Sequence, residues 1–214
     1  MGKIAILIRI IFLYLILTGC VDAKDRINIE VKKLNDSNLP YEVHEIDFVR
    51  NGENVAVREY HNGKMISAKG DLLLLFKNAC EIRIVRKKDN TSSPVGVVYT
   101  KNNRIIAENQ YKDGNYILSG KIPDGIVIEK YHDGRINNIF QYKDGKRNGY
   151  AISLYPNENL KGLSEYLDDY PEGRTLLYYE NGNLKAKFEI KNKVEKYHKE
   201  YNIDGDLIYK KGEE

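Results

Sequence analysis

The chain has 214 residues, with 34 Lys or Arg against 31 Asp or Glu and a formal net charge of +3. This balance does not indicate the basic face that nucleic-acid binding requires, so we expect no nucleic-acid partner. The length is sufficient for one sizeable domain or for an extended array of repeats.

Residues 1–20 have the layout of a secretory signal peptide. Lys3 gives a positive start, an apolar stretch interrupted by Arg9 follows, and small residues precede Cys20. One alternative is a transmembrane helix, but it needs about 20 consecutive apolar residues, which this segment lacks. Another is a buried amino-terminal helix, although nothing downstream is patterned to pack against it.

The segment Leu17-Thr18-Gly19-Cys20 resembles the lipobox of bacterial lipoproteins. The resemblance implies that residues 1–19 are removed and that the thiol of Cys20 is acylated. It also implies a protein anchored in the lipid bilayer on the extracytoplasmic side of a bacterial membrane, either inner or outer. If Arg9 blocked processing, the segment would act as an uncleaved anchor. Removal would also take away two basic residues and no acid, leaving a net charge of about +1.

If lipid occupies Cys20, the second cysteine, Cys80, has no partner within the chain, which excludes a disulfide framework. Its neighbours form a strand-like run. We therefore expect a small buried residue, with a reactive thiol as the alternative.

The rest of the chain divides into three parts. Residues 20–44 are a lead-in, and residues 45–94 are a region of degenerate hairpins. That region is expected to contain an apolar strand over residues 72–76 and a polar loop over residues 86–94. Residues 95–214 contain the clearest repeats.

A short phrase recurs along the chain: an aromatic residue, a variable residue, Asn or Asp, and Gly. Asn-Gly and Asp-Gly favour the positive φ angles of two-residue type I′ turns, so each copy predicts a β-hairpin. Looser copies also occur: Tyr201–Gly205 carries one extra residue, and Tyr155–Asn159 lacks the glycine. The expected turn glycines are Gly63, Gly114, Gly134, Gly145, Gly182 and Gly205.

The segments between the turns alternate as β-strands do. Ile126, Ile128 and Lys130 fall on one face, while their neighbours fall on the other. No segment after residue 20 has a helical period. We therefore predict an all-β fold, an elongated antiparallel meander of repeated hairpins.

These units, of roughly 22 residues, resemble MORN-variant repeats. The best copy runs from Tyr178 to Lys193, and Gln141–Tyr150 is a second. The resemblance implies a single-layered antiparallel sheet, like the amino-terminal β-domain of a histone lysine methyltransferase that shares the repeat. It implies nothing firm about activity.

No catalytic motif is present, and we expect neither an enzyme nor a cofactor. His61 and His132 both precede turns, a position typical of exposed side chains rather than of a metal site. The adjacent pair Asp168-Asp169 would point to opposite faces of a strand, which favours loop charges over an acid–base pair.

The tyrosines of the phrase are the best candidates for a binding face, because Tyr combines apolar area with a polar tip. The alternative is that these rings only cover a thin sheet. The candidates are Tyr60, Tyr111, Tyr131, Tyr142, Tyr179 and Tyr201.

These patterns predict a membrane-anchored, non-enzymatic repeat lipoprotein that acts as a protein-binding scaffold at the bacterial cell envelope. One alternative is an antitoxin or immunity-type protein, because several bacterial proteins of the MORN-variant class are labelled antitoxins. A hydrolase with an unrecognised site is the second. The open sheet edges also leave self-association as an option.

Overall fold

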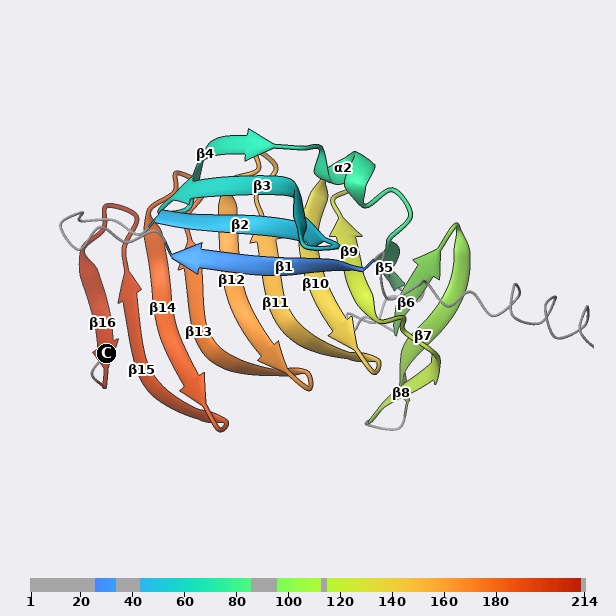
Figure 1. Ribbon diagram of the computed structural model, residues 1–214. Coiled ribbons are helices and arrows are strands. Elements are labelled where there is room, and N and C mark those ends of the chain that lie inside the picture. Colours follow the sequence, from blue (N-terminus) through green and yellow to red (C-terminus); the bar gives the residue numbers. More distant parts are fainter. Residues whose placement is uncertain (1–25, 34–42, 86–95, 113–114, 213–214) are drawn as a thin grey trace, which may run out of the picture.

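The computed structural model describes residues 26–33, 43–85, 96–112 and 115–212. These ranges contain sixteen β-strands and one short helix, α2 (Leu72–Leu75) (Figure 1). The strands are β1 (Ile27–Lys33), β2 (Val43–Arg50), β3 (Glu53–His61), β4 (Lys64–Lys69), β5 (Cys80–Val85), β6 (Gly96–Lys101), β7 (Arg104–Lys112), β8 (Asn115–Gly120), β9 (Gly125–Lys130), β10 (Ile136–Lys143), β11 (Lys146–Leu154), β12 (Leu160–Leu167), β13 (Tyr170–Tyr178), β14 (Leu184–Lys191), β15 (Val194–Tyr201) and β16 (Leu207–Lys211).

The strands form two sheets. The small sheet has the order β1-β2-β3-β4, and the large sheet has twelve strands in the order β16-β15-β14-β13-β12-β11-β10-β9-β5-β6-β7-β8. Neighbours are antiparallel except for β5 and β9, which run parallel with Cys80 opposite Val127. The predicted all-β meander of hairpins is therefore confirmed, with one parallel junction that the sequence did not indicate.

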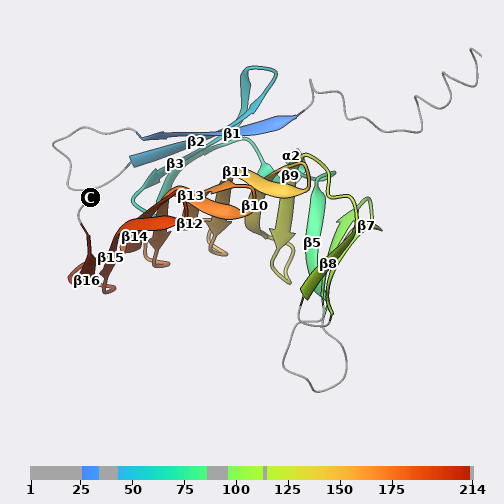
Figure 2. The ribbon, with the colours of Figure 1, turned by 90° about the horizontal axis from the view of Figure 1, so that it is seen from below.

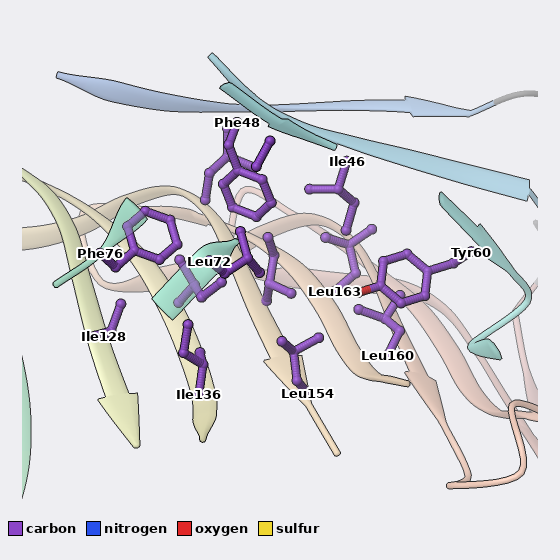
Figure 3. Packing of buried hydrophobic residues seen from close by; sticks show 14 of the residues in the cluster. Ile46, Phe48, Tyr60, Leu72, Phe76, Ile128, Ile136, Leu154, Leu160 and Leu163 are labelled. Carbon is purple, nitrogen blue, oxygen red and sulfur yellow. The ribbon is translucent and has the colours of Figure 1, made fainter. Parts of the chain in front are cut away.

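The small sheet lies across one face of the large sheet, so the fold has two layers where they overlap (Figures 1 and 2). Large apolar side chains from both sheets and α2 fill the space between them (Figure 3). Fully burying one such side chain contributes about 1.5–3 kcal/mol. The expectation of a single layer is therefore incomplete, because the small sheet buries the apolar side chains on one face of β9–β13. The labelled members of the core are Ile46, Phe48, Tyr60, Leu72, Phe76, Ile128, Ile136, Leu154, Leu160 and Leu163.

The apolar segment 72–76 forms α2 instead of a strand. The carboxylate of Asp71 caps the helix by accepting the N–H groups of Leu73 and Leu74. Phe76 then packs edge-on against Phe48, with ring centroids 5.6 Å apart. The helix therefore inserts two apolar residues, Leu72 and Phe76, at one end of the core.

Two-residue turns join the strands at one end of the large sheet. They lie at Asp144–Gly145, Asp168–Asp169 and Asn192–Lys193, and both residues of each turn have positive φ. Successive turns are 24 residues apart, slightly more than the expected 22. Asp168 and Asp169 are thus turn residues, as a loop-charge interpretation predicts.

The β3–β4 turn fastens the small sheet to the large one. The N–H of Gly63 donates to the carbonyl of Gly182 at 2.9 Å, and the N–H of Leu160 donates to the carbonyl of Gly63 at 2.7 Å. The side-chain oxygen of Asn159 also accepts the N–H of Met65 at 3.1 Å. One turn of the small sheet therefore forms hydrogen bonds with two consecutive repeats of the large sheet.

Candidate binding surface on the open face of the large sheet

We use "open face" for the side of the large sheet opposite the small sheet. Figure 2 shows the small sheet on one side only, and no other part of the chain that the structure describes covers the opposite side. Strand alternation assigns side chains to the two faces. Ile152, Leu163 and Leu176 enter the core, so their strand neighbours belong to the open face.

Small side chains form the centre of the open face. Ala151 pairs with Ser164, and Ser164 pairs with Thr175, so the three lie in one row across β11, β12 and β13. Ser153 and Gly162 form part of a second row beside it. Longer neighbours screen these small residues: Ala151 and Thr175 are only 8% and 6% exposed, and Leu177 continues the second row beside Gly162.

A groove of about 690 Å³ lies at the end of the open face where β5–β8 adjoin β9 and β10. Tyr99, Phe140 and Tyr142 line it, and the rings of Tyr99 and Tyr142 meet edge-on at 6.2 Å. Burial raises the pKa of Tyr142, and the hydrogen bond with Tyr99 raises it further. The phenol is therefore neutral over the physiological range, and the two tyrosine rings, each only 7% exposed, form a largely buried aromatic floor beneath the groove.

Charged groups form one wall of this groove. The guanidinium of Arg147 lies 4.3 Å from the ring centroid of Tyr166 and 3.3 Å from the carboxylate of Asp169. Glu129 and Lys146 also line the groove. Such a mixture of aromatic area and few charges is typical of surfaces that bind a ligand or a protein.

A second aromatic group lies at the other end of the open face. Phe188, His198 and Tyr209 come from β14, β15 and β16, and each neighbouring pair of rings is 5.3 Å apart. Glu195 and Glu200 flank His198 at 3.4 and 3.1 Å. Sequence reasoning missed this group because the three residues belong to no common motif.

Turn tyrosines form a ladder at the ends of the hairpins. The hydroxyl of Tyr131 donates to the carbonyl of Leu154 at 2.6 Å, and that of Tyr155 donates to the carbonyl of Tyr178 at 2.8 Å. Tyr179 continues the series to Tyr201 at 3.0 Å. Each tyrosine hydroxyl therefore forms a hydrogen bond between one repeat and the next, and this structural role explains the regular spacing of the tyrosines.

The turns that carry this ladder contain five residues instead of two. In the first, the N–H of Tyr131 donates to the carbonyl of Arg135 at 2.8 Å, and the Asp133 carboxylate accepts the N–H of Arg135. The same bonds recur at Tyr155–Asn159 and Tyr179–Asn183. The phrase therefore encodes two turn types, and the prediction of type I′ turns at Tyr131 and Tyr179 was wrong.

The predicted tyrosine face is only partly present. Tyr60 and Tyr142 are buried, at 1% and 7% exposure, because Tyr60 packs in the core and Tyr142 packs against Tyr99 below the groove. Tyr131, Tyr179 and Tyr201 are half-buried. The side chain of Tyr111 lies outside the described part of the structure. Tyr155, which the looser copy contained, belongs to the ladder as well.

Glycine is required at the predicted turn positions for two different physical reasons. Gly134, Gly145, Gly182 and Gly205 adopt positive φ angles, as expected for turns. Gly63 does not, but a Cβ there would lie 2.6 Å from Cβ and Cγ of Tyr178, so close packing of the two sheets requires glycine. Gly114 lies outside the described residues.

Cys80 is buried at 2% exposure, as predicted, and burial raises the pKa of its thiol to about 11. Cys20 lies outside the described residues. Within the ranges that the structure covers, no group of three or more His, Cys, Asp or Glu side chains is placed to hold a metal ion. Over those same ranges, no helix has the length and apolar character needed to cross a membrane.

A scan against protein-family models found no matching family, and a search of curated proteins found no match.

Proposed function

We propose that this chain is a membrane-anchored, non-enzymatic protein-binding scaffold of the bacterial cell envelope, built from MORN-variant repeats. The supporting observation is the open face, with small side chains at its centre and aromatic groups at both ends. Protein interfaces are enriched in aromatic residues and Arg, which both occur in the groove.

The groove is the part of this face best suited to hold a partner side chain or loop. Its aromatic residues, with Phe140 the least buried of them, supply apolar area, and the Arg147 guanidinium supplies directional hydrogen bonds. Arg147 is fixed by Tyr166 and Asp169, so it would lose little conformational entropy on binding.

The proposed anchor is the acylated thiol of Cys20, with the scaffold outside the cytoplasm. More than one acyl chain is needed for stable attachment. Metabolic labelling with a palmitate analogue, followed by membrane fractionation, tests this point. Label and membrane retention are expected in the wild type and not in Cys20→Ala. An unlabelled, soluble wild-type protein would refute the anchor.

The binding role is tested by site-specific photo-crosslinking in cells, with benzoylphenylalanine placed at Leu118 on the groove wall. Ile66 on β4 is the matched control, because the two side chains have similar exposure, 45% and 52%. A discrete protein adduct from Leu118 but not from Ile66 is expected, and it should diminish when Tyr99→Ala is added. Identical patterns from both positions would contradict a groove-centred interface.

A further inference from the structure

A cavity of about 390 Å³ lies where the small sheet meets β5, β6 and β9. Three basic side chains line it: Arg26 just before β1, Arg50 at the end of β2 and Lys101 at the end of β6. The only carboxylate among the described lining residues is that of Asp124. Segments far apart in the sequence therefore bring positive charge to one place.

Asp124 neutralises only one of these three charges. One of its oxygens lies 3.4 Å from the guanidinium of Arg26, and the other accepts the N–H of Asp144 at 2.9 Å. Within the described ranges, neither Arg50 nor Lys101 has an ion-pair partner. The lining thus carries two uncompensated positive charges.

The Nε atom of Arg50 adds a second observation. This atom is buried and has no hydrogen-bond partner among the described residues. A buried donor without an acceptor costs about 1–3 kcal/mol, so the fold retains an arginine with one buried donor that the described residues leave unused. Guanidinium groups match the paired oxygens of carboxylates and phosphates.

We propose that this cavity is a phosphate-binding site, occupied by the phosphate of a phospholipid headgroup or by free phosphate. In this arrangement Arg50 donates to the phosphate oxygens and Lys101 supplies a second positive charge. The cavity volume exceeds that of one phosphate group, which leaves room for the glycerol part of a headgroup.

The distance to the proposed anchor favours the headgroup as the source. Arg26 follows Cys20 by six residues, and an extended chain spans at most about 3.6 Å per residue, or roughly 20 Å in all. The choice of a headgroup rests on the proposed function, whereas the phosphate site itself rests only on the cavity. Binding in solution is therefore independent of lipidation.

The test is calorimetric titration of the full-length protein in dodecyl maltoside. The ligands are inorganic phosphate, glycerophosphoglycerol as the soluble headgroup of phosphatidylglycerol, and glycerol as the phosphate-free control. Arg50→Gln and Lys101→Gln are compared with Lys210→Gln, which changes the net charge equally on the exposed strand β16.

We expect both phosphate compounds to bind, glycerol not to bind, and each cavity variant to weaken binding at least tenfold while Lys210→Gln leaves it unchanged. Tenfold tighter binding of glycerophosphoglycerol than of phosphate assigns the site to headgroups, and equal or weaker binding assigns it to free phosphate. If Arg50→Gln unfolds, Lys101→Gln decides, because the Lys101 side chain forms no hydrogen bond with the residues that the structure describes.

Two results would overturn the proposal. The first is that neither phosphate compound binds at ligand concentrations up to roughly 10 mM, where a Kd corresponds to a binding free energy of about −2.7 kcal/mol. The second is that Lys210→Gln weakens binding as much as the cavity variants do. Phosphate binding together with an unlabelled Cys20 would refute the anchor and leave the cavity site intact. The two proposals therefore fail separately.

Discussion

Replacing Gly63 with Ala tests how the two sheets are held together. The new Cβ would lie 2.6 Å from Cβ and Cγ of Tyr178. A rotamer change of Tyr178 could move Cγ but not Cβ, whose position the backbone fixes, so the contact with Cβ remains. The β3–β4 turn must therefore move away from β13.

That movement would weaken the hydrogen bonds of Gly63 with Gly182 and Leu160. Overpacking costs about 1–3 kcal/mol, and each of the two hydrogen bonds contributes about 1 kcal/mol. We expect the free energy of unfolding to fall by about 2–5 kcal/mol. For a domain of this size, that corresponds to a decrease in Tm of about 5–15 °C.

Thermal unfolding followed by circular dichroism measures this loss, with Gly145→Ala as the control. Gly145 has a φ of +78° but nothing within 4 Å of an added Cβ, so Ala there should cost only the left-handed penalty of about 1–2 kcal/mol. Hydrogen exchange should accelerate in β1–β4 for Gly63→Ala and in β10–β11 for the control. A Gly63→Ala protein that is no less stable than the control, with unchanged exchange in β1–β4, would refute the reasoning.

Three further predictions concern single side chains. Tyr155→Phe removes the hydroxyl that donates to the Tyr178 carbonyl and should lower the free energy of unfolding in urea by about 0.5–1.5 kcal/mol. The control Tyr170→Phe, whose ring is exposed, should change it by less than about 0.5 kcal/mol, and equal losses would contradict a stabilising role of the tyrosine ladder. Asp71→Ala removes the cap of α2 and should cost about 1 kcal/mol, most of which Asp71→Asn should restore; no loss in Ala would show that the cap is dispensable. Because burial raises the pKa of the Cys80 thiol from 9.0 to about 11, the folded protein keeps a proton that the unfolded chain releases. The free energy of unfolding should therefore be full below pH 9 and decline toward pH 11. Cys80→Ala should flatten this decline relative to the wild type, and superimposable pH profiles would argue against a buried thiol.

The hairpin arrangement was predictable because its turns depend on local chemistry. Asp144–Gly145 adopts two positive φ angles, which Asp-Gly favours wherever it occurs. The turn type at Tyr131 and Tyr179 was not predictable from the same phrase. There, hydrogen bonds of the Asx side chain and the pairing of neighbouring strands select a five-residue turn over a two-residue one.

The packing of the small sheet over the repeats could not be predicted from local patterns. Tyr60 belongs to a strict copy of the phrase and was expected on an exposed face, yet it is among the most buried residues. The difference arises from tertiary position: β3 belongs to the layer that covers the repeats, whereas β10–β15 form the repeats themselves. A sequence window that contains one hairpin does not reveal which sheet it joins.

Side-chain size explains why the cover lies on one face and leaves the other accessible. On β11 and β12, Ile152 and Leu163 point into the core, while Ala151 and Ser164 lie on the open face. Apolar burial contributes about 25 cal/mol per Å², so a second layer over small side chains would gain much less.

The same asymmetry predicts where a partner would gain binding energy. Few interface residues carry most of the affinity, and they are mainly large aromatic residues and Arg. We therefore expect alanine substitution of Phe140 in the groove or Phe188 at the other end to weaken partner binding by at least 1 kcal/mol, about fivefold. Ser164→Ala at the centre should have almost no effect. A binding measurement in which Ser164→Ala is the most damaging of the three would mean that the partner recognises the backbone and small side chains of the centre rather than the aromatic ends.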